Sequence, residues 1–464
     1  MEEGLERARE LEALGRTDEA IKAYLEVLVG DNSNYDALIR LGVLYVNAGN
    51  LTHAHVIFAE AAKRHPGRST PHAYLANVLI DLGDVPGAVA AYEAALRADP
   101  ADRIAHRGLA IVHERSGRIA EAESAWRNGF PDGSLALSTF RGTGEPVRVL
   151  LVTSAIGGNI PLYDILDDRV FQWTTLIAES YAGDMTLPRG AVAFNSIGDA
   201  DRCGRALECA ERALSRLDAE VINPPARVRE SGRAANAARF RELEGVVAPR
   251  VVSFARAELE ASDAAQRLAA AGFGFPVLLR SPGYHTGQHF ERVDDPARLA
   301  PTLAALPGDE LLAIENVDTQ RADGTFRKYR VMFVDGRPYP VHLAISRDWK
   351  VHYFSAAMAG DAAFRDEERA FLTDLRGTLG EAGWAALDRV ARTLDLDYGG
   401  VDFAFDRAGR LVVFEANATM VIVLPDAGEH WSYRRAPLES LRAAVAAMIV
   451  RRAALSAARA ESGG

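Results

Sequence analysis

A period of 34 residues across the first part of the chain constrains its fold more than any other feature. One glycine, one alanine and one aromatic residue recur with this step. The positions are Gly15, Gly49, Gly83 and Gly117; Ala20, Ala54, Ala88 and Ala122; and Tyr24, Phe58, Tyr92 and Trp126. Pro66 and Pro100 keep the same step near the repeat ends. Self-similarity at a fixed period predicts a repeat array, in which each unit packs against its neighbours.

The spacing and the residue types together resemble the tetratricopeptide repeat (TPR). The resemblance implies two antiparallel helices per unit. The alanine would lie where the two helices approach, the aromatic ring would fill the groove between them, and the glycine would end the first helix. We therefore predict an all-α TPR superhelix of four repeats over residues 1–134.

The first helix of each TPR unit lines the concave face of such a superhelix. In this register the concave face carries Asn47, Asn77, Asp81, Arg107, Glu114 and Arg115. We interpret this face as a groove for a peptide or a partner protein, and its mixed charges indicate no particular charge for the ligand. The alternatives are an ordinary solvated face, packing of the array on the rest of the chain, and formation of a homodimer.

Composition narrows the classes of function. The net charge of −11 argues against a general nucleic-acid binder, because there is no basic excess to neutralise phosphates. No N-terminal apolar run resembles a signal peptide and no stretch is long enough to span a bilayer, so we expect a soluble cytoplasmic protein with no membrane partner. Cys203 and Cys209 match no common zinc pattern and are expected to be small core residues.

A connector and an α/β region follow the repeats. Residues 135–146 are rich in Gly, Ser, Thr and Pro and predict a linker. Three strand-then-loop units starting near residues 147, 191 and 219 predict a small α/β domain over residues 147–245. The glycine-bearing loop at 157–159 follows the first strand, where ligands of open α/β sheets bind. Tight turns also need glycine, and that is the favoured explanation of this loop.

Residues 401–417, VDFAFDRAGRLVVFEAN, predict a β-hairpin. If the turn centres on Ala408 and Gly409, Asp402 lies directly opposite Glu415, and Asn417 shares their face. Opposed carboxylates repel each other, and a divalent cation would remove that repulsion. Carboxylate and amide oxygens suit Mg²⁺. The alternative is a hairpin whose solvated face happens to be acidic, and Asp406 fits that alternative.

The segment before the hairpin supplies cations and a polar loop. A strand near 275–280 is followed by a loop whose N–H groups could close over a triphosphate. A strand at 311–317 carries a carboxylate, and two cations share one face of a strand at 328–334. The candidate residues are Arg280, His285, Gly287, Glu315, Lys328 and Arg330. Taken singly, each has an ordinary explanation, such as a surface arginine, polar filling of a loop, or charges that protect a sheet edge.

In chain order these elements resemble the ATP-grasp superfamily over about residues 147–445. The last element, GGVDF followed by EANA, is most similar to the ribosomal-protein glutamate ligases. The resemblance implies a multidomain chain: the TPR superhelix, an α/β domain that precedes the ATP-grasp core, an α+β ATP-grasp fold over residues 246–450, and a helix end with a tail over residues 451–464.

The resemblance also implies roles for single residues. Asp402, Glu415 and Asn417 would hold one or two Mg²⁺ ions. Other residues would bind ATP: Ile314, Glu315 and Asn316 at the adenine, Asp318 at the ribose, and His285, Gly287 and Lys328 at the phosphates.

The superfamily usually places a phosphate-binding lysine on each of two strands. Arg233 and Arg280 occupy those places here. Gly400 stands where D-alanine–D-alanine ligases carry an arginine, so Arg330, with Lys328, is expected to stabilise the oxyanion.

The resulting prediction is an ATP-dependent carboxylate–amine ligase. ATP would phosphorylate a carboxylate, and an amine would displace phosphate from the acyl phosphate to form an amide. The repeat array would tether a peptide or protein substrate near the site. One alternative is phosphoryl transfer that yields a stable phosphorylated product. Another is a TPR adaptor with a degenerate ATP-grasp domain, which the two lysine-to-arginine changes favour.

Overall fold

The computed structural model describes residues 2–131, 135–162, 165–183, 185–282, 287–351, 358–422 and 429–462. The chain forms two compact units. One unit comprises residues 1–134 together with residues 179–185, and the other comprises the remaining residues. Each unit is described by itself.

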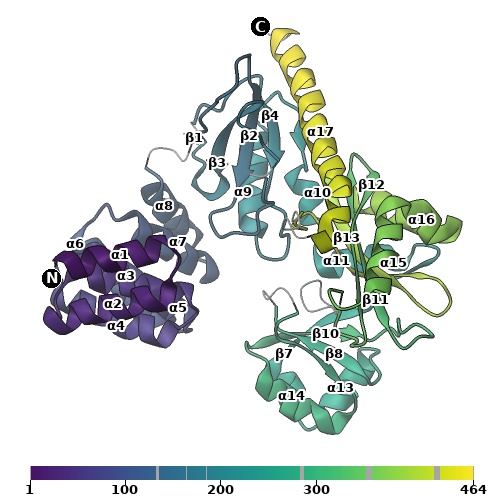
Figure 1. The fold of residues 1–464 in the computed structure, drawn as a ribbon, viewed down its shortest axis with the longest axis horizontal. Helices are drawn as coiled ribbons and strands as arrows, with labels where there is room; N and C mark the ends of the chain where they lie inside the picture. Colours follow the sequence, from purple (N-terminus) through teal and green to yellow (C-terminus); the bar gives the residue numbers. More distant parts are fainter. Residues whose placement is uncertain are drawn as a thin grey trace. The chain divides into compact units, whose positions relative to one another are not determined.

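Within residues 2–131 the chain forms eight helices, which confirms the predicted all-α array of helix pairs (Figure 1). Their bounds are α1 (Glu2–Ala13), α2 (Thr17–Gly30), α3 (Tyr35–Asn47), α4 (Leu51–Arg64), α5 (Ser69–Asp81), α6 (Val85–Ala98), α7 (Arg103–Arg115) and α8 (Ile119–Gly129). The recurrent glycines have φ between 70° and 85°, a left-handed conformation that lets the first helix of each pair end sharply. Asn34, Asn50, Asp84 and Asp102 cap helices by accepting backbone N–H bonds.

The recurrent alanine and aromatic residues form the core of the array, as predicted. Ala20, Ala54 and Ala88 are fully buried, and the aromatic rings beside them are at most 2% exposed. The ring of Phe58 lies so close to Gly42 that a Cβ at that position would come within 2.4 Å of it. The helix pairs therefore pack through small residues and rings, because only small residues leave room for the aromatic side chains.

The second unit begins with a sheet in the order β1-β3-β2-β4-β5. Its strands are β1 (Leu135–Leu137), β2 (Val147–Thr153), β3 (Phe171–Ile177), β4 (Val192–Asn195) and β5 (Val221–Ile222). All neighbours are parallel except β1, which pairs antiparallel with β3. Helices α9 (Gly204–Leu214), α10 (Pro225–Arg229) and α11 (Arg233–Arg241) complete this α/β part. The expected strand-then-loop units are present, but β1 lies inside the expected linker of residues 135–146, and β3 was not predicted.

An antiparallel sheet in the order β7-β10-β8-β9 follows. Its strands are β7 (Val251–Ala255), β8 (Val277–Arg280), β9 (Phe290–Val293) and β10 (Glu310–Glu315). Helices α12 (Arg256–Glu260), α13 (Ala264–Ala270) and α14 (Leu299–Ala305) supply its core, which includes Leu259, Leu268, Leu303 and the buried residues of β8 and β10.

The last sheet has the order β12-β11-β13-β14-β6. Its strands are β6 (Val246–Val247), β11 (Phe326–Val334), β12 (Arg337–Ser346), β13 (Tyr398–Phe405) and β14 (Leu411–Asn417). Helices α15 (Ala362–Thr373) and α16 (Leu375–Leu394) contact β12 and β14. The short helix η3 (Glu429–Arg434) leads into α17 (Arg435–Ser462), the long yellow helix of Figure 1. The expected boundary between residues 450 and 451 lies within this helix, and the helix ends inside the segment 451–464 that was expected to hold a helix end.

Helix α17 joins the first and last sheets of this unit, because it contacts β2, β4, β5, β11 and β12. Arg452 of this helix contacts three carboxylates, those of Glu220 at 3.0 Å, Asp335 at 3.2 Å and Asp397 at 2.9 Å. The buried Asn223 adds a second link. Its side chain accepts a hydrogen bond from the backbone N–H of Tyr398 and donates one to the Tyr398 carbonyl, as a neighbouring strand would.

Candidate functional site

The acidic hairpin forms as predicted, and Asp402 is directly opposite Glu415. The route to this register differs from the expectation. Phe405 pairs with Leu411 and Phe403 with Val413, so the turn centres on Ala408 alone. A β-bulge at Phe414 then inserts one extra residue and restores the predicted pairing beyond it. Asp406 is not part of an acidic face, because it folds back to accept the N–H groups of Ala408 and Arg410 in the turn.

Asp402 is a buried carboxylate held by two cations. Arg330 Nε and Nη2 donate to its two oxygens at 2.6 and 2.9 Å, and Lys328 Nζ lies 2.8 Å from Oδ2. The side chain of Asp402 is only 1% exposed. Burial alone would raise the pKa of Asp402, but Lys328 and Arg330 outweigh it and hold the pKa well below its usual range. The expected placement of Lys328 and Arg330 on one face of a strand is confirmed.

Glu415 is the more accessible carboxylate, with its side chain 30% exposed. Arg233 Nη2 donates to its Oε1 at 2.9 Å, and Asn417 Nδ2 donates to the same oxygen at 3.0 Å. Burial would raise the pKa of Glu415, but the positive charge of Arg233 lowers it below its usual value. Arg233 lies in the first turn of α11, which corrects our expectation that it replaces a lysine on a strand. The alanines that follow it favour a helix there.

Arg280 ends strand β8 close to these groups. Burial and, to a smaller extent, the charge of Arg233 lower its pKa to about 10, although Glu415 acts in the opposite direction. Its guanidinium also lies 5.9 Å from the centre of the Phe290 ring. Among the described residues, the site thus gathers four cationic side chains around two carboxylates: Arg233, Arg280, Lys328 and Arg330 around Asp402 and Glu415. That composition favours the binding of an anion with several negative oxygens.

Two further residues, His342 and Thr419, shape the cluster. His342 on β12 pairs with Arg330 across the sheet and is buried. Burial, followed by the charge of Arg330, holds the pKa of His342 well below its usual value, so the ring is neutral. Thr419 holds the Asn417 side-chain oxygen through its N–H at 3.0 Å and its hydroxyl at 2.9 Å. The spacing of two residues between Asn417 and Thr419 is a local turn signal that could have revealed this contact.

The glycine at position 400 is explained by packing. A Cβ there would lie 2.5 Å from the sulfur of Met332, 2.8 Å from that of Met420 and 3.1 Å from the Val331 carbonyl. The backbone of β13 therefore has no room for a larger side chain at this position.

The residues expected at the adenine and ribose lie at and after the end of β10. Ile314 is half-buried and pairs with Val251 and Leu278. The carboxylate of Glu315 accepts the N–H of Arg250 at 3.0 Å, so it fixes the end of this sheet. Asn316 is half-buried, and Asp318 is paired with Arg407 at 2.9 Å.

The structure describes the two glycine-bearing loops to different extents. Gly287 has a φ of 74° and lies close to the side chain of Lys350, while His285 lies outside the described residues. In the loop at 157–159, Asn159 bonds the backbone of Ser154 in both directions, and a Cβ on Gly158 would lie 2.7 Å from the Cys203 sulfur. These contacts agree with the favoured structural explanation of this loop.

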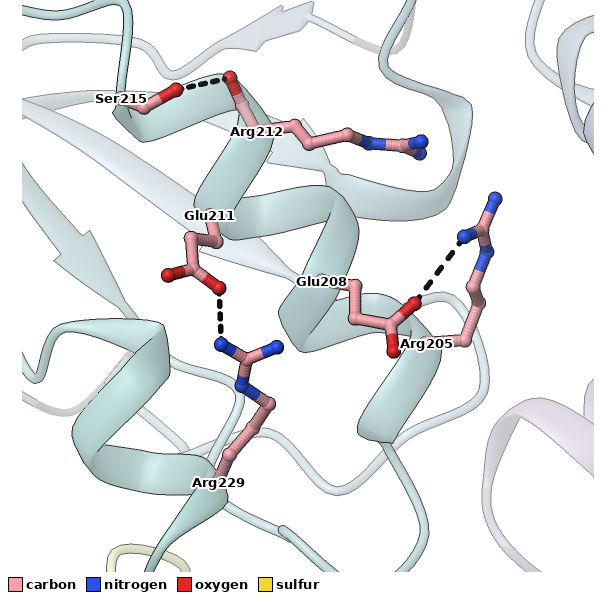
Figure 2. Close-up of a pocket in the computed structure, with 6 residues that line it drawn as sticks. All are labelled: Arg205, Glu208, Glu211, Arg212, Ser215 and Arg229. Atoms are coloured by element: carbon pink, nitrogen blue, oxygen red, sulfur yellow. Dashed lines mark hydrogen bonds and ion pairs between the residues drawn. The ribbon is translucent and has the colours of Figure 1, made fainter.

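A separate groove of about 310 Å³ lies on the charged outer face of α9 (Figure 2). Arg205 donates to Glu208 at 3.3 Å, and Arg229 donates to Glu211. Ser215 donates to the Arg212 carbonyl at 3.0 Å. The groove therefore alternates positive and negative charge, and none of the residues predicted for the site lines it.

The donor set of the hairpin fits Mg²⁺ in its chemistry, since two carboxylates and an amide oxygen are hard ligands. Among the residues that the structure describes, no three His, Cys, Asp or Glu side chains gather as a metal cluster, so an ion here would rely on Asn417 as well. The repulsion that we expected a metal to remove is already relieved by Lys328, Arg330 and Arg233. The metal role of Asp402, Glu415 and Asn417 stays a prediction.

The tetratricopeptide repeat family matches residues 5–69 and 75–130. Similar solved structures include MamA, with 21% identity over 27% of this chain and 72% of that chain and a TM-score of 0.25. A tetratricopeptide repeat protein from Parabacteroides merdae has 19% identity over 28% and 50% of the two chains and a TM-score of 0.26. A thermophilic TPR protein in Thermus thermophilus has 20% identity over 28% and 73% and a TM-score of 0.26. No curated protein matches the chain.

The first part of the chain is therefore a TPR array, a class of module that binds proteins, and it precedes a region of mixed strands and helices. No helix within the described ranges is both long and apolar enough to cross a membrane.

The structure separates the residues expected on the concave face into two groups. Asn77 accepts a hydrogen bond from the Tyr92 hydroxyl at 2.6 Å, and Glu114 accepts one from the Trp126 indole at 2.9 Å, so both have roles inside the repeats. Arg107 donates to the Arg103 carbonyl at 3.0 Å and lies over the Phe130 ring. Asp81 is exposed, and Arg115 is near enough to affect its ionisation. Asn47 is exposed at the end of α3.

We expect Asn77→Ala to lower the free energy of unfolding of the array by about 1–3 kcal/mol, because the buried Tyr92 hydroxyl would lose its acceptor. Burial, followed by the charge of Asp81, raises the pKa of Tyr92 to about 12. Glu93→Ala, at an exposed position of the helix that carries Tyr92, is the control and should change stability by less than about 0.5 kcal/mol. Urea unfolding followed by circular dichroism measures both. Equal effects of the two substitutions would contradict the structural role of Asn77.

Proposed function

We propose that the second unit is an ATP-dependent carboxylate–amine ligase on an ATP-grasp framework. One observation carries the proposal: two opposed carboxylates of a hairpin lie among four cations contributed by α11, β8 and β11. Ordinary sheet surfaces do not gather opposed carboxylates with a surplus of cations, because like charges this close destabilise the fold. A nucleotide triphosphate with a divalent ion complements both halves of the cluster.

The order of the elements supports the same framework. An antiparallel sheet that carries Arg280 and Glu315 precedes a second sheet whose strands carry Lys328 and Arg330, then Asp402, then Glu415. The small α/β part precedes both, and α17 and Asn223 join it to the last sheet. These features agree with the resemblance seen in the sequence.

The chemistry proposed for the site starts from a free carboxylate, which is a poor acyl donor. Its oxygen attacks the terminal phosphorus of ATP, and the bond to the ADP oxygen breaks. The amine nitrogen then attacks the acyl carbon of the acyl phosphate, the bond from that carbon to the phosphate oxygen breaks, and the nitrogen loses a proton, which leaves an amide and inorganic phosphate. When bound, Mg²⁺ offsets negative charge on the phosphoryl oxygens. Arg280 and Lys328 bind phosphate oxygens, and Arg330 stabilises the oxyanion that develops at the acyl carbon. Asp402 orients both Lys328 and Arg330 through its ion pairs.

The TPR array suggests the kind of substrate. A repeat array that binds a peptide or protein raises the effective concentration of that molecule at a site on the same chain. We therefore propose that one of the two substrates is a peptide or protein held by the concave face, with Asp81, Arg115 and Asn47 as the side chains available for contact.

Thermal unfolding with and without Mg²⁺·ATP tests the nucleotide site. A nucleotide at about 100 times its dissociation constant should stabilise the folded protein by about 2.7 kcal/mol. We expect Glu415→Ala to abolish this gain while remaining folded, because its side chain is partly exposed and its loss leaves Arg233 near solvent. Glu381→Ala, which removes the same group from an exposed ion pair on α16, should keep the full gain.

The outcomes separate the candidates. A metal-dependent gain that Glu415→Ala loses supports the nucleotide site, and analysis of the product then separates an amide from a stable phosphorylated compound. If Mg²⁺·ATP does not stabilise the folded wild-type protein, the enzyme hypothesis is wrong. The adaptor hypothesis then remains, and the TPR array supports it on its own.

A further inference from the structure

We propose that Lys328, Arg330 and Arg233 are exchangeable counter-ions, so that a divalent cation and a polyphosphate bind this site together and each binds weakly alone. This inference rests on the proposed nucleotide site. It adds a rule for how that site is filled.

Both side-chain oxygens of Asp402 already interact with protein cations. Three nitrogens of Lys328 and Arg330 lie 2.6 to 2.9 Å from its two oxygens. The side chain is 1% exposed, so a cation cannot approach it from solvent without moving one of these groups. Lys328 is the more replaceable of the two, because it makes one contact with Asp402 whereas Arg330 holds it with a two-pronged pair.

The other expected ligands are engaged in the same way. Glu415 Oε1 accepts from both Arg233 and Asn417. The side-chain oxygen of Asn417, which is the atom a metal would need, accepts the N–H and hydroxyl of Thr419. A metal ion alone must therefore displace a protein donor at Asp402 and at Asn417 and must compete with Arg233 for Glu415. The cation displaced from Asp402 would be left in a largely buried site. A buried charge without a partner is strongly unfavourable.

A polyphosphate removes this obstacle. Its oxygens can accept hydrogen bonds from Lys328, Arg330 and Arg233 when the metal ion binds the carboxylates. Every charged group then keeps a partner of opposite charge. The same argument holds in reverse, because a polyphosphate without a metal must compete with Asp402 and Glu415 for these cations. Each ligand therefore raises the affinity of the other by the same factor, and such coupling is typically about 5- to 150-fold.

Lys328→Met tests the exchange without any nucleotide. The substitution removes one competitor from Asp402 and leaves the Arg330 pair, so the variant should fold. We expect Mn²⁺ alone, measured by electron paramagnetic resonance of the free ion, to bind this variant about tenfold tighter than the wild type, within the usual range of such coupling. Tripolyphosphate alone should bind it more weakly. Lys63→Met in α4 of the repeat array is the matched control and should change neither affinity.

The outcomes distinguish this inference from the proposed function. Mn²⁺ affinity that is unchanged or lower in Lys328→Met overturns the exchange, even when Mg²⁺·ATP stabilises the wild type in a Glu415-dependent manner. No Mn²⁺ binding to any variant, together with no stabilisation by Mg²⁺·ATP, overturns both. Should Lys328→Met not fold, Arg233→Met makes the same prediction at Glu415, which is partly exposed.

Discussion

Replacing Asp402 with asparagine should destabilise the second unit by about 3–5 kcal/mol, one of the two largest effects that the structure predicts. Asparagine keeps the shape of the side chain but removes the negative charge that lies within 3 Å of both Lys328 and Arg330. Two cations would then share a buried site without that counter-ion. Because Asp402 has a depressed pKa, the stability it provides is present above the unfolded pKa of about 3.9 and is lost as the pH falls towards its lower folded value.

Thermal unfolding of the variant measures this effect. For a unit of this size, each kcal/mol lost should lower the melting temperature by about 2–4 °C. Asp366→Asn is the matched control, because Asp366 forms an exposed pair with Arg369 and should change stability by less than about 1 kcal/mol. A change in Asp402→Asn no larger than in this control would show that the buried cluster does not stabilise the fold.

The second large effect concerns Glu368 of α15, which is fully buried. Its carboxylate accepts hydrogen bonds from the Arg434 guanidinium at 2.6 Å, from the Tyr433 hydroxyl, and from the backbone N–H of Leu343 at 3.3 Å. These bonds hold η3 against β12, directly beside His342. We expect Glu368→Gln to cost about 3–5 kcal/mol, since it leaves the buried guanidinium of Arg434 without this counter-charge.

A double substitution sharpens the second prediction. Glu368→Leu with Arg434→Met removes both charges, so it should be less damaging than Glu368→Gln alone, because no unpaired charge remains. Glu439→Gln, in an exposed pair of α17, is the control and should be nearly neutral. A double variant that is less stable than the single one would show that the pair contributes more than mutual neutralisation. Urea unfolding of the four proteins supplies the comparison.

The repeat array could be predicted from sequence because its signal is redundant. The same requirement for a small residue, a ring and a left-handed turn recurs in every repeat, and any one of them suffices to set the register. The hairpin could be predicted because its two strands and its turn are adjacent in the sequence. The strand β3 was missed because its half-buried residues, such as Thr174 and Thr175, lack the apolar run that marks β2.

The candidate site was predictable in part. The facing of Asp402 and Glu415 follows from hairpin geometry, although the bulge at Phe414 could not be foreseen from a symmetric turn. The pairing of Lys328 and Arg330 with Asp402 depends on the order β11-β13, which joins strands about 70 residues apart in sequence. The approach of Arg233 from α11 needs the packing of a helix on β14, and no local pattern carries that information.

The join made by α17, Arg452 and Asn223 has a mechanical consequence for the second unit. These contacts fasten the α/β sheet to the last sheet, so the two behave as a single frame. The sheet β7-β10-β8-β9 is attached to that frame along the chain only through the short segments before β7 and after β10. A rotation of this sheet relative to the frame would therefore bend the backbone at those two segments and move Arg280 relative to Asp402 and Glu415.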